Sequence, residues 1–347
     1  MRITAIPASC LQLPVRAHST TRLPDFFTLM KPRVMLLAVF TALVGLMIAP
    51  VHLDPRLGSV AILAIAAGAG AAGVLNMWYE ADIDAIMART ARRPIPRGTI
   101  SRREALAFGL VLACSAVAVL GIAAKVNAAA LLAFAIFFYV VVYTVWLKRH
   151  TPQNIVIGGV AGALPPVIGW AAATGDIGLE PLILFLIIFL WTPPHFWALS
   201  LNRADEYSRA GVPMLPVVAG GAATTRQVLI YSVLLVPTSM LPWVLGFAGT
   251  LYGGVALVCG AMLIVLALRL RRSKGTNRQA AHRLFVFSIS YLFLLFAALL
   301  ANTSGDRWSP RFSDRSAPIA AGSVEAELLP SLERSARVSN SVTADET

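Results

Sequence analysis

The chain has 347 residues, of which 57% are hydrophobic and only 13% are charged, and its mean hydropathy is +0.73. Soluble domains carry about a quarter charged residues, so this composition excludes an ordinary water-soluble protein. The formal net charge of +12 follows from the placement of Arg and Lys beside membrane spans, as described below, and we expect no nucleic-acid partner.

Nine apolar runs follow one another along the chain: 34–51, 57–78, 105–124, 126–147, 155–173, 179–199, 228–248, 251–270 and 284–300. Each is close to the ~20 residues that a helix needs to cross the ~30 Å hydrocarbon core of a bilayer. Strands of a membrane barrel would alternate polar and apolar residues, and these runs do not. The sequence predicts an all-α, polytopic protein of the lipid bilayer, with about nine transmembrane helices in a ring around a central cavity.

The positions of Lys and Arg predict the orientation, because cytoplasmic loops carry an excess of them. Of the 29 such residues, 22 lie in the N-terminal segment or in the loops after the even-numbered runs, and the intervening loops hold only Arg56 and Lys125. We expect a multi-pass protein of a bacterial cell (inner) membrane, with the N-terminus in the cytoplasm and the C-terminus outside.

The two ends differ in composition from the region between them. Residues 1–25 are predicted to form a cytoplasmic tail and residues 26–301 the transmembrane domain. Residues 302–347 are rich in Ser, Ala and charged residues, and a segment of this kind is expected to be disordered.

Two features resemble chemical motifs but have simpler explanations. Gly68, Gly70 and Gly73 spell G-x-G-x-x-G, yet they lie inside an apolar run with no strand before it, so we interpret them as residues that let helices pack closely. The three cysteines form no C-x-x-C pair, and they predict neither a metal site nor covalent haem attachment.

Polar residues gather where the second run ends. Asn76, Glu80 and Asp84 are four residues apart, which places them on one face of a helix, where like charges repel. A divalent cation would relieve this repulsion, and two carboxylates with an amide oxygen suit Mg²⁺, which also binds phosphate oxygens. Arg89 and Arg93 follow and could hold those phosphates. The stretch predicts a Mg²⁺–diphosphate site; the alternative is a solvated helix end followed by topology-setting arginines.

The other basic loops carry similar residues. Lys148 and Arg149 lie at the end of the fourth run, while Arg203, Asp205 and Glu206 follow the sixth. A second acidic pair beside basic residues permits a second Mg²⁺ on the same diphosphate. The alternative is a set of charged side chains that reach from the membrane to its surface.

His195 is the only histidine inside a predicted span, and we place it near the middle of that span. An imidazole in a membrane is costly and usually faces the interior of the bundle. It could bind haem iron, relay a proton, or bond to a carbonyl freed by Pro193 and Pro194. The sequence leaves these three roles open.

With these residues in view, the chain resembles the UbiA-type intramembrane prenyltransferases over about residues 26–301. The family signature N-x-x-x-[D/E]-x-x-x-D…R-x-x-x-R-P is matched by Asn76, Glu80, Asp84, Arg89, Arg93 and Pro94. Its protohaem IX farnesyltransferase (haem O synthase) branch is suggested by residues 31–33, 76–79, 193–197 and 206–216. Glu80 stands where Asp is commoner, and Asn202 replaces the acid expected four residues before Glu206, which favours one metal ion over two.

The resemblance implies transfer of a farnesyl group from farnesyl diphosphate to a vinyl group of haem b, giving haem O for haem A and terminal oxidase biogenesis. Haem A synthase is then a candidate partner. The implied catalytic residues are Asp84, Tyr143 and His195, with Mg²⁺ on Asn76, Glu80, Asp84 and Glu206 and the diphosphate on Arg89, Arg93, Lys148, Arg149 and Arg203. Two alternatives are a quinone-precursor prenyltransferase and a transporter, which would carry mid-membrane charges and related halves.

Overall fold

The computed structural model describes residues 23–303. Eight helical segments in this part are long and apolar enough to span a membrane, and the bent pair α1 and α2 makes a ninth. The prediction of about nine spans is confirmed. In chain order the spans are α1 (Leu23–Leu29) with α2 (Pro32–Met47), α3 (Pro55–Tyr79), α5 (Arg102–Ala123), α6 (Val126–Phe137) with the π-helix η2 (Phe138–Leu147) and α7 (Lys148–His150), α8 (Asn154–Ala163) with α9 (Pro165–Thr174), α10 (Leu179–Leu201), α13 (Gly220–Val244), α14 (Thr250–Arg272) and α15 (Arg278–Thr303).

Several element boundaries differ from the predicted ones: α13 starts at Gly220, eight residues before the 228–248 run, and α15 starts at Arg278, six residues before the 284–300 run. The first predicted run, 34–51, corresponds to α2, which starts at Pro32 and ends earlier, at Met47. Proline lacks an N–H group and tolerates the first turn of a helix, which explains the start. The two proposed tails, 1–25 and 302–347, lie almost entirely outside the described residues.

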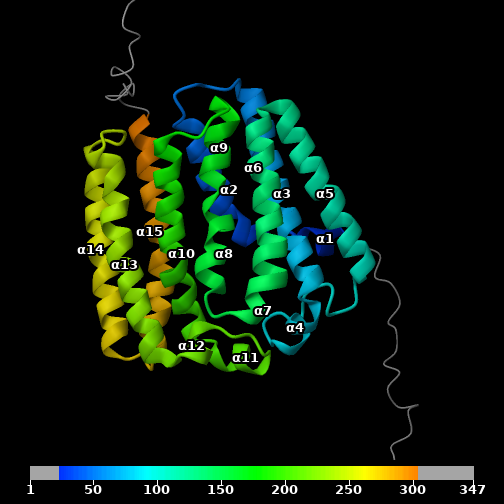
Figure 1. Cartoon of the computed structure of the whole chain (residues 1–347), viewed down its shortest axis with the longest axis vertical. Coiled ribbons are helices and arrows are strands. Elements are labelled where there is room, and N and C mark those ends of the chain that lie inside the picture. Colours follow the sequence, from blue (N-terminus) through cyan, green and yellow to red (C-terminus); the bar gives the residue numbers. More distant parts are fainter. Residues whose placement is uncertain (1–22, 304–347) are drawn as a thin grey trace, which may run out of the picture. The chain divides into compact units, whose positions relative to one another are not determined.

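The spans form a ring. Each packs against the next along the chain, and α15 returns to α2, which confirms the predicted arrangement (Figure 1). The short helices α4 (Ala81–Ile86), α11 (Ala204–Arg209) and α12 (Leu215–Val218) lie at one end of the bundle with α7. We call this the basic end, because the Arg-rich loops are there. The cavity within the ring stays a prediction.

Glycine allows α2 and α9 to approach closely. A Cβ atom on Gly45 would overlap the carbonyl oxygen of Pro166, and one on Gly169 would overlap that of Ala42. The two helices therefore pack backbone to backbone, as small residues permit in membrane proteins. This reciprocal contact joins the first span to the fifth.

The G-x-G-x-x-G run also serves packing, as predicted. A Cβ on Gly68 would lie 2.8 Å from a methyl group of Leu132, and one on Gly70 would lie 2.7 Å from Cε of Met30. Gly73 faces the Met30 carbonyl oxygen, 3.2 Å from where its Cβ would be. Gly70 and Gly73 let the chain break between α1 and α2 lie directly on α3, and Gly68 makes room for Leu132 of α6.

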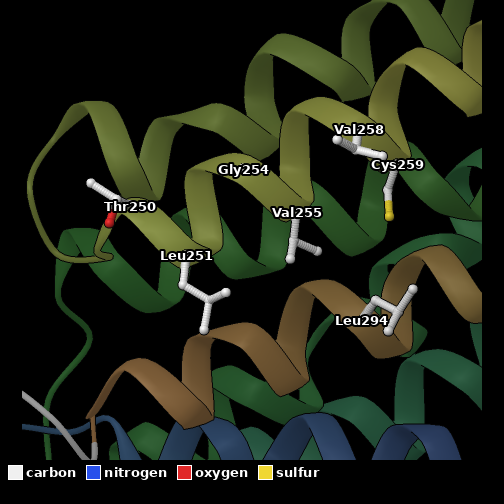
Figure 2. A pocket seen from close by; sticks show the side chains of 7 residues that line it. All are labelled: Thr250, Leu251, Gly254, Val255, Val258, Cys259 and Leu294. Atoms are coloured by element: carbon white, nitrogen blue, oxygen red, sulfur yellow. The ribbon is translucent and has the colours of Figure 1, made fainter.

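A groove of about 690 Å³ lies along α14 and is bounded on α15 by Leu294. Its lining is mainly apolar and includes Cys259 and, at the start of α14, Thr250 (Figure 2). Since α14 runs from Thr250 to the basic end at Arg272, the groove lies towards the other end of the bundle, away from the predicted diphosphate site.

Candidate active site at the basic end

The predicted metal ligands are buried where α3 gives way to α4. Asn76 and Glu80 each expose only 2% of their surface, and Asp84 exposes 3%. The single helix expected through all three ends at Tyr79, and Glu80 joins α3 to α4 in a turn. The backbone N–H groups of Glu80 and Asp84 still donate to the carbonyls of Asn76 and Glu80, at 3.0 and 2.8 Å, so the four-residue spacing is preserved.

Each of these three side chains has a basic partner from another segment. Lys148 Nζ lies 2.5 Å from Glu80 Oε1, and Arg93 lies 2.6 Å from Asp84 Oδ2. Lys31 Nζ donates to Asn76 Oδ1 at 2.5 Å. Buried charges are costly without partners, so the pairing explains how two carboxylates are accommodated here. It also brings three basic side chains, those of Lys31, Arg93 and Lys148, to one place.

Lys31 reaches this cluster through the bend in the first span. Helices α1 and α2 meet at 57°, and Lys31 between them has left-handed backbone angles, φ 56° and ψ 54°. Such angles cost a non-glycine residue roughly 1–2 kcal/mol, so the surrounding contacts, among them that of Lys31 with Asn76, must hold the bend. The charges that act on Lys31 include those of Glu80, Asp84 and Arg93.

The π-helix η2 supplies the opposite wall. Thr144 is fully buried, accepts a hydrogen bond from Asn76 Nδ2 at 3.0 Å and donates one to the Tyr139 carbonyl at 2.8 Å. π-helical turns are wider than α-helical ones and often occur at functional sites. In the π-helix, residues five apart lie one above the other, so Tyr139 is on the same face as Thr144. The ring centres of Tyr139 and Tyr143 lie 5.4 Å apart. Lys148 Nζ is 6.0 Å from the centre of the Tyr143 ring.

Arg149 lies at the rim of the cluster. Two of its nitrogens donate to the two carboxylate oxygens of Asp82, at 2.9 and 3.0 Å, and its guanidinium is 4.9 Å from the centre of the Tyr79 ring. Donation by Arg149 holds the pKa of the Asp82 carboxyl below its ordinary value. The proposed diphosphate contact of Arg149 stays a prediction.

The segment after α10 packs against the segment around α4. Ile83 and Met87 share one buried cluster with Tyr207, Val212 and Met214. The charges that act on Arg89 include those of Asp84, Arg93 and Arg203. The two predicted motif regions therefore meet at the basic end, as expected.

Glu206 has an unsatisfied oxygen. Its Oε1 lies 3.5 Å from Arg203, whereas its Oε2 is buried without a hydrogen-bond partner among the described residues. The Oδ1 atom of Asn202, four residues earlier, is buried and unpartnered in the same way. A buried unpaired acceptor is destabilising, and a bound cation is one group that could satisfy such an oxygen. Asn202, which replaces the acid of the family pattern, and Glu206 thus have the same four-residue spacing as Asn76 and Glu80.

The ligands at this site suit a Mg²⁺ ion whose coordination shell is supplied only in part by the protein. Within residues 23–303, no three His, Cys, Asp or Glu side chains come together as a metal-binding group. Two carboxylates with amide oxygens suit an ion that keeps waters and takes phosphate oxygens from its substrate. The neighbouring cations could then bind the phosphate itself.

His195 lies elsewhere in α10 than we predicted. It is six residues from the end of α10 at the basic end, and therefore not near the middle of the span. Its Nδ1 is 2.7 Å from Ser288 Oγ on α15, and Trp191 stacks on its ring at 4.3 Å. The helix continues through Pro193 and Pro194.

Residues 38–304 match the family model described as the UbiA prenyltransferase family. The chain belongs to this family. It is 58% identical over 299 residues to a protohaem IX farnesyltransferase of Afipia carboxidovorans, covering 86% of this chain and 96% of that protein. It is 62% identical over 279 residues to one of Azorhizobium caulinodans, covering 80% and 91%. As a member of this family the chain is a prenyltransferase enzyme.

Solved structures of UbiA-type proteins share the fold. A digeranylgeranylglyceryl phosphate synthase superposes with a TM-score of 0.68 at 20% identity, covering 81% of this chain and 98% of that one. A UbiA homologue from Archaeoglobus fulgidus, bound to GPP and Mg²⁺, gives 0.56 at 16% identity, covering 79% and 99%.

Four residues of this UbiA-type site carried no predicted role: Lys31, Tyr139, Thr144 and Asn202. Lys31 could have been predicted as a site residue, because it stands before a proline at the edge of an apolar run. A charged group that is buried there needs a partner. Tyr139 and Thr144 join the site through the π-helical register, for which the sequence offers no comparable signal.

Proposed function

We propose that this enzyme transfers the farnesyl group of farnesyl diphosphate to a vinyl group of haem b, giving haem O. The names of its relatives support this choice of substrates. The observation that carries the proposal is the buried cluster in which Asn76, Glu80 and Asp84 each contact a basic side chain. Acidic and basic groups in such proximity suit a metal-bound diphosphate.

In this proposal Asn76, Glu80 and Asp84 hold Mg²⁺, and Glu206 with Asn202 contributes to a second ion. Bound Mg²⁺ would neutralise charge that develops on the leaving diphosphate. Lys148 and Arg93 would move from their carboxylates to the diphosphate oxygens, joined by Arg89, Arg149 and Arg203, which the resemblance assigns to the same group. Their charges act most strongly in a buried, water-poor site.

The reaction begins with cleavage of the bond between farnesyl C1 and the diphosphate oxygen, whose electron pair leaves with the diphosphate. The resulting allylic cation would be stabilised by the aromatic faces of Tyr143 and Tyr139. The π electrons of a haem vinyl group then form the new carbon–carbon bond. Water adds to the remaining cation and loses a proton, which completes the hydroxyethylfarnesyl group. Enclosure by the ring of helices would keep bulk water from the first cation.

The same charge distribution orients the protein in a cell (inner) membrane. The basic end would face the cytoplasm, with the N-terminus, because positively charged loops are retained there. Farnesyl diphosphate is polar only at its diphosphate and would enter with that group at the basic end. The product would pass within the membrane to an enzyme that oxidises haem O, for which haem A synthase is the candidate partner.

Purified protein in lipid nanodiscs tests the proposal. Haem b is incubated with farnesyl, geranyl or geranylgeranyl diphosphate, with Mg²⁺ or with EDTA, and products are identified by mass. We expect haem O only with farnesyl diphosphate and Mg²⁺. Prenylation of 4-hydroxybenzoate in place of haem b would contradict the proposed acceptor, and equal rates in EDTA would contradict the metal.

A further inference from the structure

The contact between α10 and α15 holds an imidazole in a defined orientation. The rings of Trp191 and Phe285 both stack on His195, at centroid distances of 4.3 and 4.7 Å and interplanar angles of 17° and 26°. Phe196 meets it edge-on at 5.3 Å. Stacked neighbours fix the ring plane, and only 8% of the residue is exposed.

The hydrogen bonds of Ser288 decide which nitrogen of His195 carries the proton. Ser288 Oγ lies 2.7 Å from His195 Nδ1 and donates to the Phe285 carbonyl, also at 2.7 Å. A serine hydroxyl has one hydrogen to donate. Both bonds can therefore form together only if His195 Nδ1 carries the hydrogen and donates it to Ser288.

This tautomer leaves Nε2 with a free lone pair. The hydrogen bond that His195 makes within residues 23–303 involves Nδ1, and Nε2 has no partner in this part of the chain. The indole N–H of the neighbouring Trp191 does not donate to Nε2, because it donates to the Ser288 carbonyl at 2.7 Å. A neutral imidazole whose Nδ1–H is held by an acceptor is the usual form of a histidine that binds a metal through Nε2.

We propose that Ser288 is a positioning residue for the reaction: it fixes the Nδ1–H tautomer of His195, so that Nε2 binds the iron of the haem substrate. The proposal rests on the proposed function, in which haem b is the acceptor. It resolves the three roles left open for His195 in favour of an iron ligand.

The depth of His195 agrees with this role. Six residues separate it from the end of α10, or about 9 Å at 1.5 Å per residue. The haem iron would thus lie deeper in the membrane than the diphosphate cluster. A vinyl group at the porphyrin rim could then extend towards the basic end, where farnesyl C1 is released.

Haem b titration of the nanodisc-embedded protein, followed by the Soret band, tests the proposal. The variants are His195→Ala, Ser288→Ala, Ser288→Thr and a control, Ser232→Ala. Ser232 is likewise buried and donates to a carbonyl of its own helix, that of Val228, but no side chain bonds to it in the described contacts. Affinity for a non-hydrolysable farnesyl diphosphate analogue is measured on the same samples.

We expect His195→Ala to lose the wild-type Soret band. Ser288→Ala should weaken haem b binding by about 10–100-fold, as loss of a partner of a metal-bound histidine typically does. Ser288→Thr, which keeps the hydroxyl, should restore it, and Ser232→Ala should match wild type. The affinity for the diphosphate analogue should stay unchanged throughout.

A wild-type Soret band and haem affinity in Ser288→Ala would overturn the proposal, as would a wild-type Soret band in His195→Ala. If Ser288→Ala does not fold, Ser288→Cys, a weaker acceptor of similar size, is compared by the iron–histidine stretching frequency of the ferrous complex. A lower frequency than wild type supports the proposal and an equal one overturns it. Farnesyl transfer by the wild-type protein is measured separately. If haem O is formed but the haem spectra do not change in the His195 and Ser288 variants, the proposed function stands, and iron binding by His195 and the positioning role of Ser288 are both refuted.

Discussion

Lys31 Nζ donates a 2.5 Å hydrogen bond to Asn76 Oδ1, joining the bend of the first span to the end of the second. Asn76 in turn donates to Thr144 on η2 at 3.0 Å. Three spans are thus tied together through one amide side chain. The lysine brings to the site a basic group, which carries a positive charge when it is protonated, from 45 residues away in the sequence.

Replacing Lys31 by Gln should remove this charge and keep a polar side chain of similar length. If the cation binds the diphosphate, kcat/KM for farnesyl diphosphate should fall by about 10²-fold, as when one charge-stabilising donor is lost. Arg33→Gln is the control, because Arg33 is exposed two residues away. Equal kcat/KM values for the two variants would assign Lys31 to structure alone.

Asp84→Asn preserves the shape of the side chain and removes its charge. Metal ions supply several kcal/mol of transition-state stabilisation, so we expect turnover below about a tenth of wild type, even at saturating Mg²⁺, in a protein that stays folded and membrane-inserted. Arg103→Ala, at an exposed position, should leave turnover nearly unchanged. Wild-type activity in Asp84→Asn would argue against a metal ligand at this position.

Thr144→Val tests the link between η2 and α3. Valine has the same shape, but it leaves the Asn76 amide without its acceptor and removes the hydroxyl hydrogen bond to the Tyr139 carbonyl. A buried unsatisfied group costs about 1–3 kcal/mol, so the melting temperature should fall, together with activity. Thr224→Val provides the comparison, since Thr224 is equally buried and bonds only to the Gly220 carbonyl of its own helix. Similar losses in the two variants would show that the bond to Asn76 contributes little.

Gly169→Ala should destabilise the contact between α2 and α9. The added Cβ would overlap the Ala42 carbonyl oxygen, and a backbone atom cannot move aside as a side chain can. Overpacking of this kind costs about 1–3 kcal/mol or more. Gly254→Ala, where a Cβ would have nothing within 4 Å, should be neutral or slightly stabilising because alanine favours helix. The two variants are compared by thermal unfolding in detergent; equal melting temperatures would refute the close approach.

The fold class could be predicted from the sequence, because the length of a hydrophobic run is a local property. Each run such as 105–124 shows the ~20 apolar residues that a bilayer requires, and the structure has a span there. The spacing of Asn76, Glu80 and Asp84 was also visible, because i, i+4 neighbours stay together wherever the backbone keeps helical hydrogen bonds. In the same way, the glycines at 68, 70 and 73 could be assigned to packing from their apolar surroundings alone.

Which basic side chain pairs with which acidic one could not be predicted and depends on how the spans pack. Lys148 pairs with Glu80, although the two residues are 68 positions apart in the sequence. Contacts between such distant residues form only when the spans have packed. The π-helical register of η2 likewise depends on its contacts, since it places Thr144 beside Asn76. Ser288 is one of many serines in apolar runs, and its role follows from the 2.7 Å contact with His195. Sequence specifies the groups that must be satisfied when buried, and packing determines the partners that satisfy them.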